Sequence, residues 1–197
     1  MTNHADKTIT ALQVNLQFLA RDGSKRSALI RLDGYLLLDG QPLAAVGRHD
    51  DQPPQVMAPG KTASLRSRPQ TDVDPDSVVA SLRYVVFDDG SWVGDARAVE
   101  TIFEGRASEA LAWRHVASVL ETARRGTTGR HALDIARQSL NTDPPGDIFT
   151  AHRVRDTITQ ALDDSTQPLD AAELVQRLIE IATLNAAAAD KHSSRQH

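Results

Sequence analysis

The feature that most constrains this fold is a change in the period of the apolar residues near Asp95. Before that residue, apolar and polar side chains alternate with period two, which is typical of strands with one buried face. After it, apolar residues recur at steps of three and four, which is typical of amphipathic helices. The 197-residue chain is therefore predicted to be an α+β protein, with a β-rich half followed by a helical half.

Short apolar runs separated by turn residues make up the first half. The alternating run 11–20 predicts one strand, and residues 28–38 and 43–46 predict a hairpin around the Asp-Gly-Gln-Pro turn. Further strands are expected at 61–68 and 77–87, with an exposed proline-containing loop at 47–60. Short strands at this spacing predict an antiparallel β-sandwich over residues 6–94.

Four helices are predicted in residues 95–190. The first is long and ends near Gly126, the second covers 129–140, Asp147 caps the third, and the fourth begins after Asp170. Trp113 falls in the apolar stripe of the long helix, where core packing is favoured over a ligand platform. A single arginine, Arg106, interrupts that stripe. Residues 191–197 are expected to be a disordered tail.

Composition excludes several classes of chemistry. The net charge of −4 is spread over both halves without a basic block, so a nucleic-acid-binding surface is not predicted. The chain contains no cysteine, which excludes disulfides and thiolate chemistry. No apolar run reaches the roughly 20 residues that a transmembrane helix needs, and the N-terminus lacks a signal-peptide core. These observations do not assign a compartment.

Three short segments carry a resemblance to a known class of domain. They are Thr-Ile-Thr-Ala at 8–11, Ala-Pro-Gly at 58–60 and Tyr-Val-Val-Phe-Asp-Asp-Gly-Ser at 84–91. Together they resemble Ig-like β-sandwich domains of uncharacterised bacterial proteins, often from the cell envelope. The resemblance implies a sandwich fold, and an extracytoplasmic location if a leader and a first strand have been removed. Such domains carry a further strand before the segment that matches 9–20, so an open sheet edge is expected, which a protein partner or a second copy would cover.

Two histidine–aspartate pairs have a spacing that places both members on one helix face. His131 lies three residues before Asp134, and His152 lies four residues before Asp156. A shared metal site is one interpretation, but no His-Glu-x-x-His motif supports it, so surface histidines are favoured and no cofactor is predicted.

Two acidic stretches in the β-rich half have simpler explanations. The run 72–76 has calcium-loop spacing, yet Ser77 and Arg83 replace the required glycine and glutamate, so an EF-hand is rejected. The His-Asp-Asp run 49–51 is an acid–base pair or, as favoured, part of a solvated loop.

The segment 88–95 is predicted to be a structural joint. Asp88, Asp89 and Gly90 form a turn after the last strand of the sandwich, and Asp95 is placed to cap the long helix. Trp92 is expected to pack between the two halves.

Three functions are compatible with these patterns. The leading one is a non-enzymatic protein-binding or scaffold module, because no nucleophile, phosphate loop or metal motif is found. The second is a hydrolase or metal-dependent enzyme with a site between sandwich and helices. The third is a self-assembling structural protein in which another chain completes the sheet.

Overall fold

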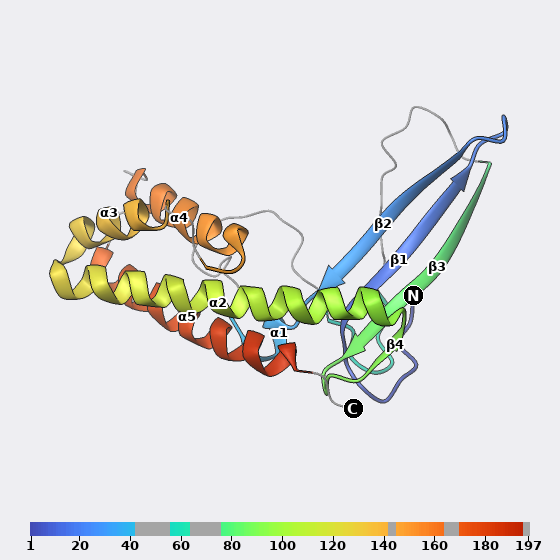
Figure 1. Ribbon diagram of the computed structural model, residues 1–197, viewed down its shortest axis with the longest axis horizontal. Helices are drawn as coiled ribbons and strands as arrows, with labels where there is room; N and C mark the ends of the chain where they lie inside the picture. Colours follow the sequence, from blue (N-terminus) through green and yellow to red (C-terminus); the bar gives the residue numbers. More distant parts are fainter. Residues whose placement is uncertain (42–55, 64–75, 142–144, 164–169, 195–197) are drawn as a thin grey trace. The chain divides into compact units, whose positions relative to one another are not determined.

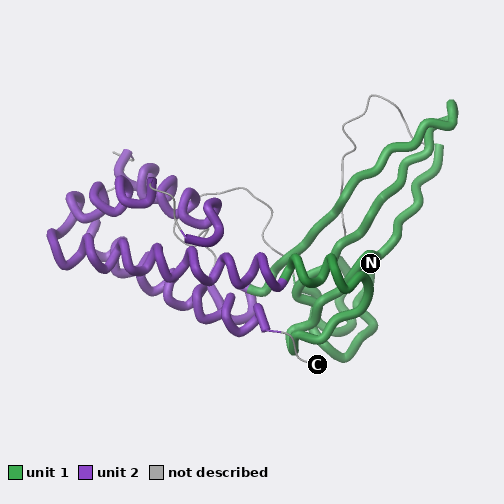
Figure 2. The backbone as a smooth tube through the Cα atoms, viewed as in Figure 1, with its two compact units in different colours: residues 1–35, 53–102, 195–197 green, residues 36–52, 103–194 purple. Residues whose placement is uncertain are grey.

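A computed structural model shows two compact units (Figure 2) and describes residues 1–41, 56–63, 76–141, 145–163 and 170–194. Unit 1 comprises Met1–Tyr35, Pro53–Ile102 and Arg195–His197, and unit 2 comprises Leu36–Gln52 and Phe103–Ser194. The boundary after Ile102 falls inside a helix, whereas the sequence predicts a boundary at residue 94.

Unit 1 contains one antiparallel sheet of four strands in the order β2-β1-β3-β4 (Figure 1). The strands are β1 (Ile9–Leu19), β2 (Lys25–Asp33), β3 (Ser77–Phe87) and the short β4 (Trp92–Gly94). The predicted strand at 77–87 is confirmed residue for residue, since β3 has the same bounds. The α+β class follows from this sheet and the helices described below.

The described residues hold a single sheet where the sequence predicts a two-sheet sandwich. One reason is that Leu36–Asp39, predicted to continue a strand, instead forms a helical turn, α1. The predicted strand 43–46 lies outside the described residues, and so does 64–68. The part of 61–68 that is described contributes only an isolated bridge between Thr62 and Thr2.

One hydrophobic cluster of unit 1 lies on one face of the sheet. Its buried members are Ile9, Leu12, Val14, Met57 and Val85. On the opposite face, Ala11, Val86 and Tyr84 are buried as well. Leu12 and Val14 are two residues apart on β1, so they point to the same face, as period-two alternation requires. Leu16, Ile30 and Leu32 extend this face as partly buried neighbours.

Unit 2 is helical. Besides α1 it contains the helices α2 (Ala96–Gly126, of which residues 96–102 belong to unit 1), α3 (Gly129–Ser139), α4 (Ile148–Asp163) and α5 (Ala171–Ser193). The N-termini of α5 and α4 are both capped, and the cap at Asp147 was predicted. Asp170 accepts the N–H groups of Ala172 and Glu173, and Asp147 Oδ2 accepts the N–H of Thr150 at 2.9 Å.

Four helices of unit 2 share one apolar core. Its largest buried side chains are Trp113, Leu120, Leu133, Leu140, Ile158, Leu178 and Ile181. The placement of Trp113 in a core stripe is therefore confirmed. The C-terminal end differs from expectation, because Lys191–Ser193, predicted to be disordered, form the last residues of α5. No helix among the described residues is long and apolar enough to cross a membrane.

Candidate functional site

One end of the sheet in unit 1 is exposed. We define the exposed sheet end as residues 15–19 of β1, 25–31 of β2 and 77–83 of β3. Seven residues in succession, Ser77 to Arg83, are exposed on β3, although the following Tyr84 is buried. The sheet therefore extends well beyond the residues that its own core covers.

Apolar side chains continue along the exposed sheet end on the same face as the core. The pairing aligns Val14 with Ile30 and Leu82, Leu16 with Ala28 and Ala80, and Phe18 with Arg26 and Val78. Val78 and Leu82 are 50% and 54% exposed. Directly opposed residues of an antiparallel pair point to the same face, so these rows form an apolar surface that is an extension of the core.

The two edges of this segment differ. Among the described residues, β2 is the terminal strand of the sheet along its whole length of nine residues. β3 is covered by β4 only from Tyr84 to Val86, so residues 77–83 form a second edge in the described part of unit 1. Open edges present unpaired backbone N–H and C=O groups, which are able to accept another strand.

The predicted joint contains a tight turn stabilised by charge. Asp89 Oδ1 accepts the backbone N–H of Ser91 at 2.9 Å and its hydroxyl at 2.6 Å, while Lys7 Nζ lies 2.6 Å from Asp89 Oδ2. Gly90 has φ +79°, and Asp88 donates its N–H to Thr8 O. These contacts hold the turn to the N-terminal segment of unit 1, a structural role.

The charged turn should make part of the stability of unit 1 sensitive to acid. The Lys7 ammonium, followed by the Ser91 hydroxyl and N–H, lowers the pKa of Asp89 from 3.8 to about 2. Because the pKa is lower in the folded state, the carboxylate stabilises unit 1 above its unfolded pKa, and this contribution is lost as the pH falls towards 2. Asp89→Asn should therefore make unit 1 less stable near neutral pH and flatten its loss of stability from about pH 5 to about pH 2.5.

Urea unfolding of unit 1 at several pH values tests this expectation. Asp88→Asn is the matched control, because Asp88 is the neighbouring carboxylate and the N–H that it donates to Thr8 is unchanged by the substitution. Identical pH profiles for Asp89→Asn and the unmodified chain would show that the turn does not use this charge.

The remaining joint residues lie at the start of α2. Asp95 accepts the N–H of Ala98 at 3.1 Å and pairs with Arg83 at 3.0 Å, and both contacts lower its pKa. The side chain is thus an N-cap for α2. Trp92 is half-buried on β4 opposite Val86. The predicted packing of Trp92 between the two halves stays a prediction.

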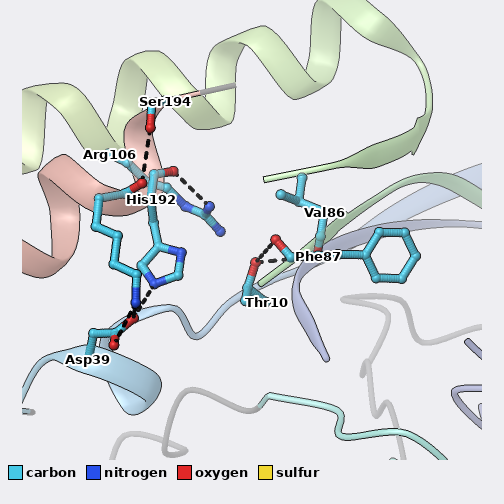
Figure 3. A network of polar contacts seen from close by, with 8 residues as sticks. Thr10, Asp39, Val86, Phe87, Arg106, His192 and Ser194 are labelled. Atoms are coloured by element: carbon cyan, nitrogen blue, oxygen red, sulfur yellow. Dashed lines mark hydrogen bonds and ion pairs between the residues drawn. The ribbon is translucent and has the colours of Figure 1, made fainter. Parts of the chain in front are cut away.

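Unit 2 contains a polar network that joins α1 to the end of α5 (Figure 3). Asp39 accepts hydrogen bonds from Lys191 Nζ at 2.9 and 2.8 Å, and its Oδ2 lies 2.6 Å from Nε2 of the buried His192. The Lys191 ammonium, and more weakly His192, hold the pKa of Asp39 below its ordinary value although partial burial raises it. Asp39 is thus an ionised acceptor, and His192 donates from Nε2.

Arg106 belongs to the same network. It is 1% exposed, donates from a guanidinium nitrogen to the carbonyl oxygen of His192 at 3.1 Å, and lies over the Phe103 ring at 5.9 Å. These contacts explain why an arginine interrupts the apolar stripe of α2. The interruption of the stripe is visible in the sequence, but the partner is not, since His192 is 86 residues away.

A second contact fixes the segment after α1. The Asn185 amide accepts the N–H of Gln41 at 2.7 Å and donates to the Gln41 carbonyl at 3.0 Å, in the manner of a paired strand. A Cβ atom at Gly40 would lie 2.7 Å from Asn185 Oδ1, so glycine permits this approach. With the Asp39 pair, this contact stabilises a fold in which Leu36–Asp39 is helical.

No protein-family model, curated protein or solved structure matches this chain. The resemblance to Ig-like domains therefore stays a prediction.

The predicted metal-ligand pairs lie on α3 and α4. His131 is exposed, Asp134 pairs with Arg137 at 3.1 Å, and Asp156 pairs with Arg155 at 2.7 Å. His152 is half-buried on α4. Within the described ranges, no three His, Asp or Glu side chains are close enough together to hold a metal ion. The runs 49–51 and 72–75 lie outside those ranges.

Proposed function

We propose that this protein is a non-enzymatic protein-interaction module that binds its partner through the exposed sheet end. The observation that carries the proposal is the row of apolar residues that continues from the core onto exposed positions of β3, above all Val78 and Leu82. Contiguous exposed apolar surface is uncommon on monomers and marks interaction sites.

The energetics favour covering this surface. Fully burying an aliphatic side chain of this size contributes about 1.5–3 kcal/mol, and Val78 and Leu82 each keep half or more of their surface in water. A partner that covered them would gain much of that free energy. The open edges add unpaired backbone groups, which set the direction of an added strand.

To test this proposal, peptides that bind the intact chain are selected from a displayed peptide library. The affinity of the selected peptides is then compared between two double variants of the chain. Val78→Ser with Leu82→Ser removes the exposed apolar row of β3. We expect the selected peptides to bind that variant about 10-fold or more weakly, because two buried aliphatic contacts are lost.

Leu111→Ser with Phe149→Ser is the matched control, since these residues are 48% and 71% exposed on helices of unit 2. Peptides bound by the control and the unmodified chain but not by the β3 variant support the proposal. Peptides that bind the β3 variant unchanged contradict it. Circular dichroism of both variants must match the unmodified chain, so that loss of binding is not loss of fold.

The Ig-like relationship and an extracytoplasmic location belong to the same proposal. The segments at 8–11, 58–60 and 84–91 motivate them. The exposed sheet end is compatible with such a relationship, because a neighbouring strand or sheet would cover it.

A further inference from the structure

We infer that the partner at β2 is a second copy of this chain, whose β2 pairs antiparallel with the first and continues the sheet across both copies. This inference rests on the proposed function, because it uses the same exposed sheet end. It adds the identity of the partner and the register of the contact.

The strand β2 is built to accept a neighbour. It is the last strand of the sheet in the part of the chain that the structure describes. All nine of its residues are at least partly exposed, and Leu29 at its centre is 54% exposed. Leu29 lies on the face opposite to Ala28 and Ile30, so the middle of the strand is apolar on both faces. A strand paired with β2 would therefore make apolar contacts on both faces of the sheet.

The charges of β2 select one register with a second copy. A two-fold axis through Leu29 sets the two Leu29 side chains opposite each other and places Ala28 opposite Ile30. The same axis places Lys25 of each copy opposite Asp33 of the other. Opposite charges at directly opposed positions stabilise an antiparallel pair.

Neighbouring registers lack this complementarity. With the two-fold axis at Ala28, Lys25 of one copy would lie opposite Arg31 of the other. With the axis at Ile30, Lys25 would lie opposite Tyr35 and no longer opposite Asp33. In the register centred on Leu29, Arg31 is only diagonal to Lys25 of the copy, at about 7–8 Å, and Asp33 is closer. Pairing about Leu29 therefore uses the whole strand without opposing like charges.

Basic residues on an edge strand also have a simpler role, which is to prevent edge-to-edge aggregation. Lys25, Arg26 and Arg31 would repel most registers of a second copy. Asp33 at the other end of the strand removes that repulsion in one register only. The charges thus oppose open-ended association and permit one closed, symmetric pair.

Cysteine crosslinking tests the contact directly, because the chain has no cysteine of its own. In the full chain, Leu29→Cys places two thiols opposite each other at the axis, with Cβ atoms about 4.5–5.5 Å apart. We expect mild oxidation to give mainly a disulfide-linked dimer. Val79→Cys is the matched control, because Val79 is 60% exposed and lies on the same face on β3, away from the axis.

A reciprocal charge exchange tests the register. In Lys25→Glu, two acidic residues face each other twice in the pair, and in Asp33→Lys two basic residues do. Each single variant should raise the dimer dissociation constant in sedimentation equilibrium by about 10-fold or more. The double variant Lys25→Glu with Asp33→Lys should return the dissociation constant to that of the unmodified chain. Such a recovery would not occur if the single variants had simply lost their fold.

The inference is established if three results are obtained together. Leu29→Cys gives a disulfide-linked dimer, Val79→Cys does not, and the double charge variant restores the dimerisation that each single charge variant weakens. A strictly monomeric chain overturns it, and so does a dimer unaffected by the single charge variants. If the chain is monomeric while library peptides still require Val78 and Leu82, the inference fails and the proposed function stands. If neither is seen, both fail.

Discussion

Gly94→Ala should destabilise unit 1 by about 3 kcal/mol or more. Gly94 ends β4 with φ +114°, a backbone conformation that side chains other than glycine rarely adopt. A Cβ atom there would lie 2.3 Å from Arg83 O and 2.8 Å from Tyr84 Cα, both in the backbone of β3. Neither the conformation nor the contact can relax without moving β4 away from its partner strand.

Gly60→Ala separates conformational strain from steric overlap in the same unit. Gly60 also has a positive φ, +71°, but a Cβ atom there would meet nothing within 4 Å. We expect a cost of about 1 kcal/mol, which is the strain term alone. Hydrogen exchange of β3 peptides as a function of urea measures both values. Equal effects of the two substitutions would contradict the close packing at Gly94.

Unit 2 offers the same comparison. A Cβ atom at Gly146, where φ is +84°, would lie 2.2 Å from Ser108 O, whereas Gly129 has φ +64° and open space around it. Gly146→Ala should therefore be the more damaging of the two, by about 2 kcal/mol. Exchange of α4 and α5 peptides reports this difference.

Arg106→Ala should cost unit 2 about 3 kcal/mol. The substitution removes a buried donor from the carbonyl of His192 and leaves a cavity where the guanidinium lies over Phe103. A hydrogen bond to a charged group contributes about 1.5–3 kcal/mol, and lost packing adds to it. Because the carbonyl belongs to the last residues of α5, the end of that helix should lose protection first.

Arg125→Ala is the control for this prediction. Arg125 lies on the same helix, its side chain is 80% exposed, and it forms a long ion pair of 3.9 Å with Glu121. Surface pairs of this kind contribute at most about 1 kcal/mol, so little change is expected. Urea unfolding followed at 222 nm measures both variants. If Arg106→Ala is as stable as Arg125→Ala, the network does not hold α5.

The sequence predicted the local elements well where the period of apolar residues is regular. β3, the start of α2 after Asp95, the cap Asp147 and the start of α5 after Asp170 all follow from patterns within a few residues. It was less informative at Leu36–Asp39, where a run of leucines fits a strand as well as a helix. In the structure this segment is helical, and it and the residues after it contact Lys191, His192 and Asn185, which are more than 140 residues away.

The candidate surface was predicted only in part. An open sheet edge was expected from the missing first strand of an Ig-like pattern, without a position for that edge. The register of β1 with β2 and β3 is what places Leu16, Val78 and Leu82 on one face and leaves β2 at the end of the sheet. A period-two pattern states which residues share a face within a strand, but not which strands are neighbours.

The sequence by itself determined the α+β class, the order of the main strands and helices, and the helix caps, because these depend on periodicity and on hydrogen bonds within a few residues. Only the tertiary structure decided the strand order, the exposed end of the sheet and the burial of Arg106 against His192. These features depend on contacts between residues far apart in the chain, and a local pattern carries no information about which distant residue will be the partner.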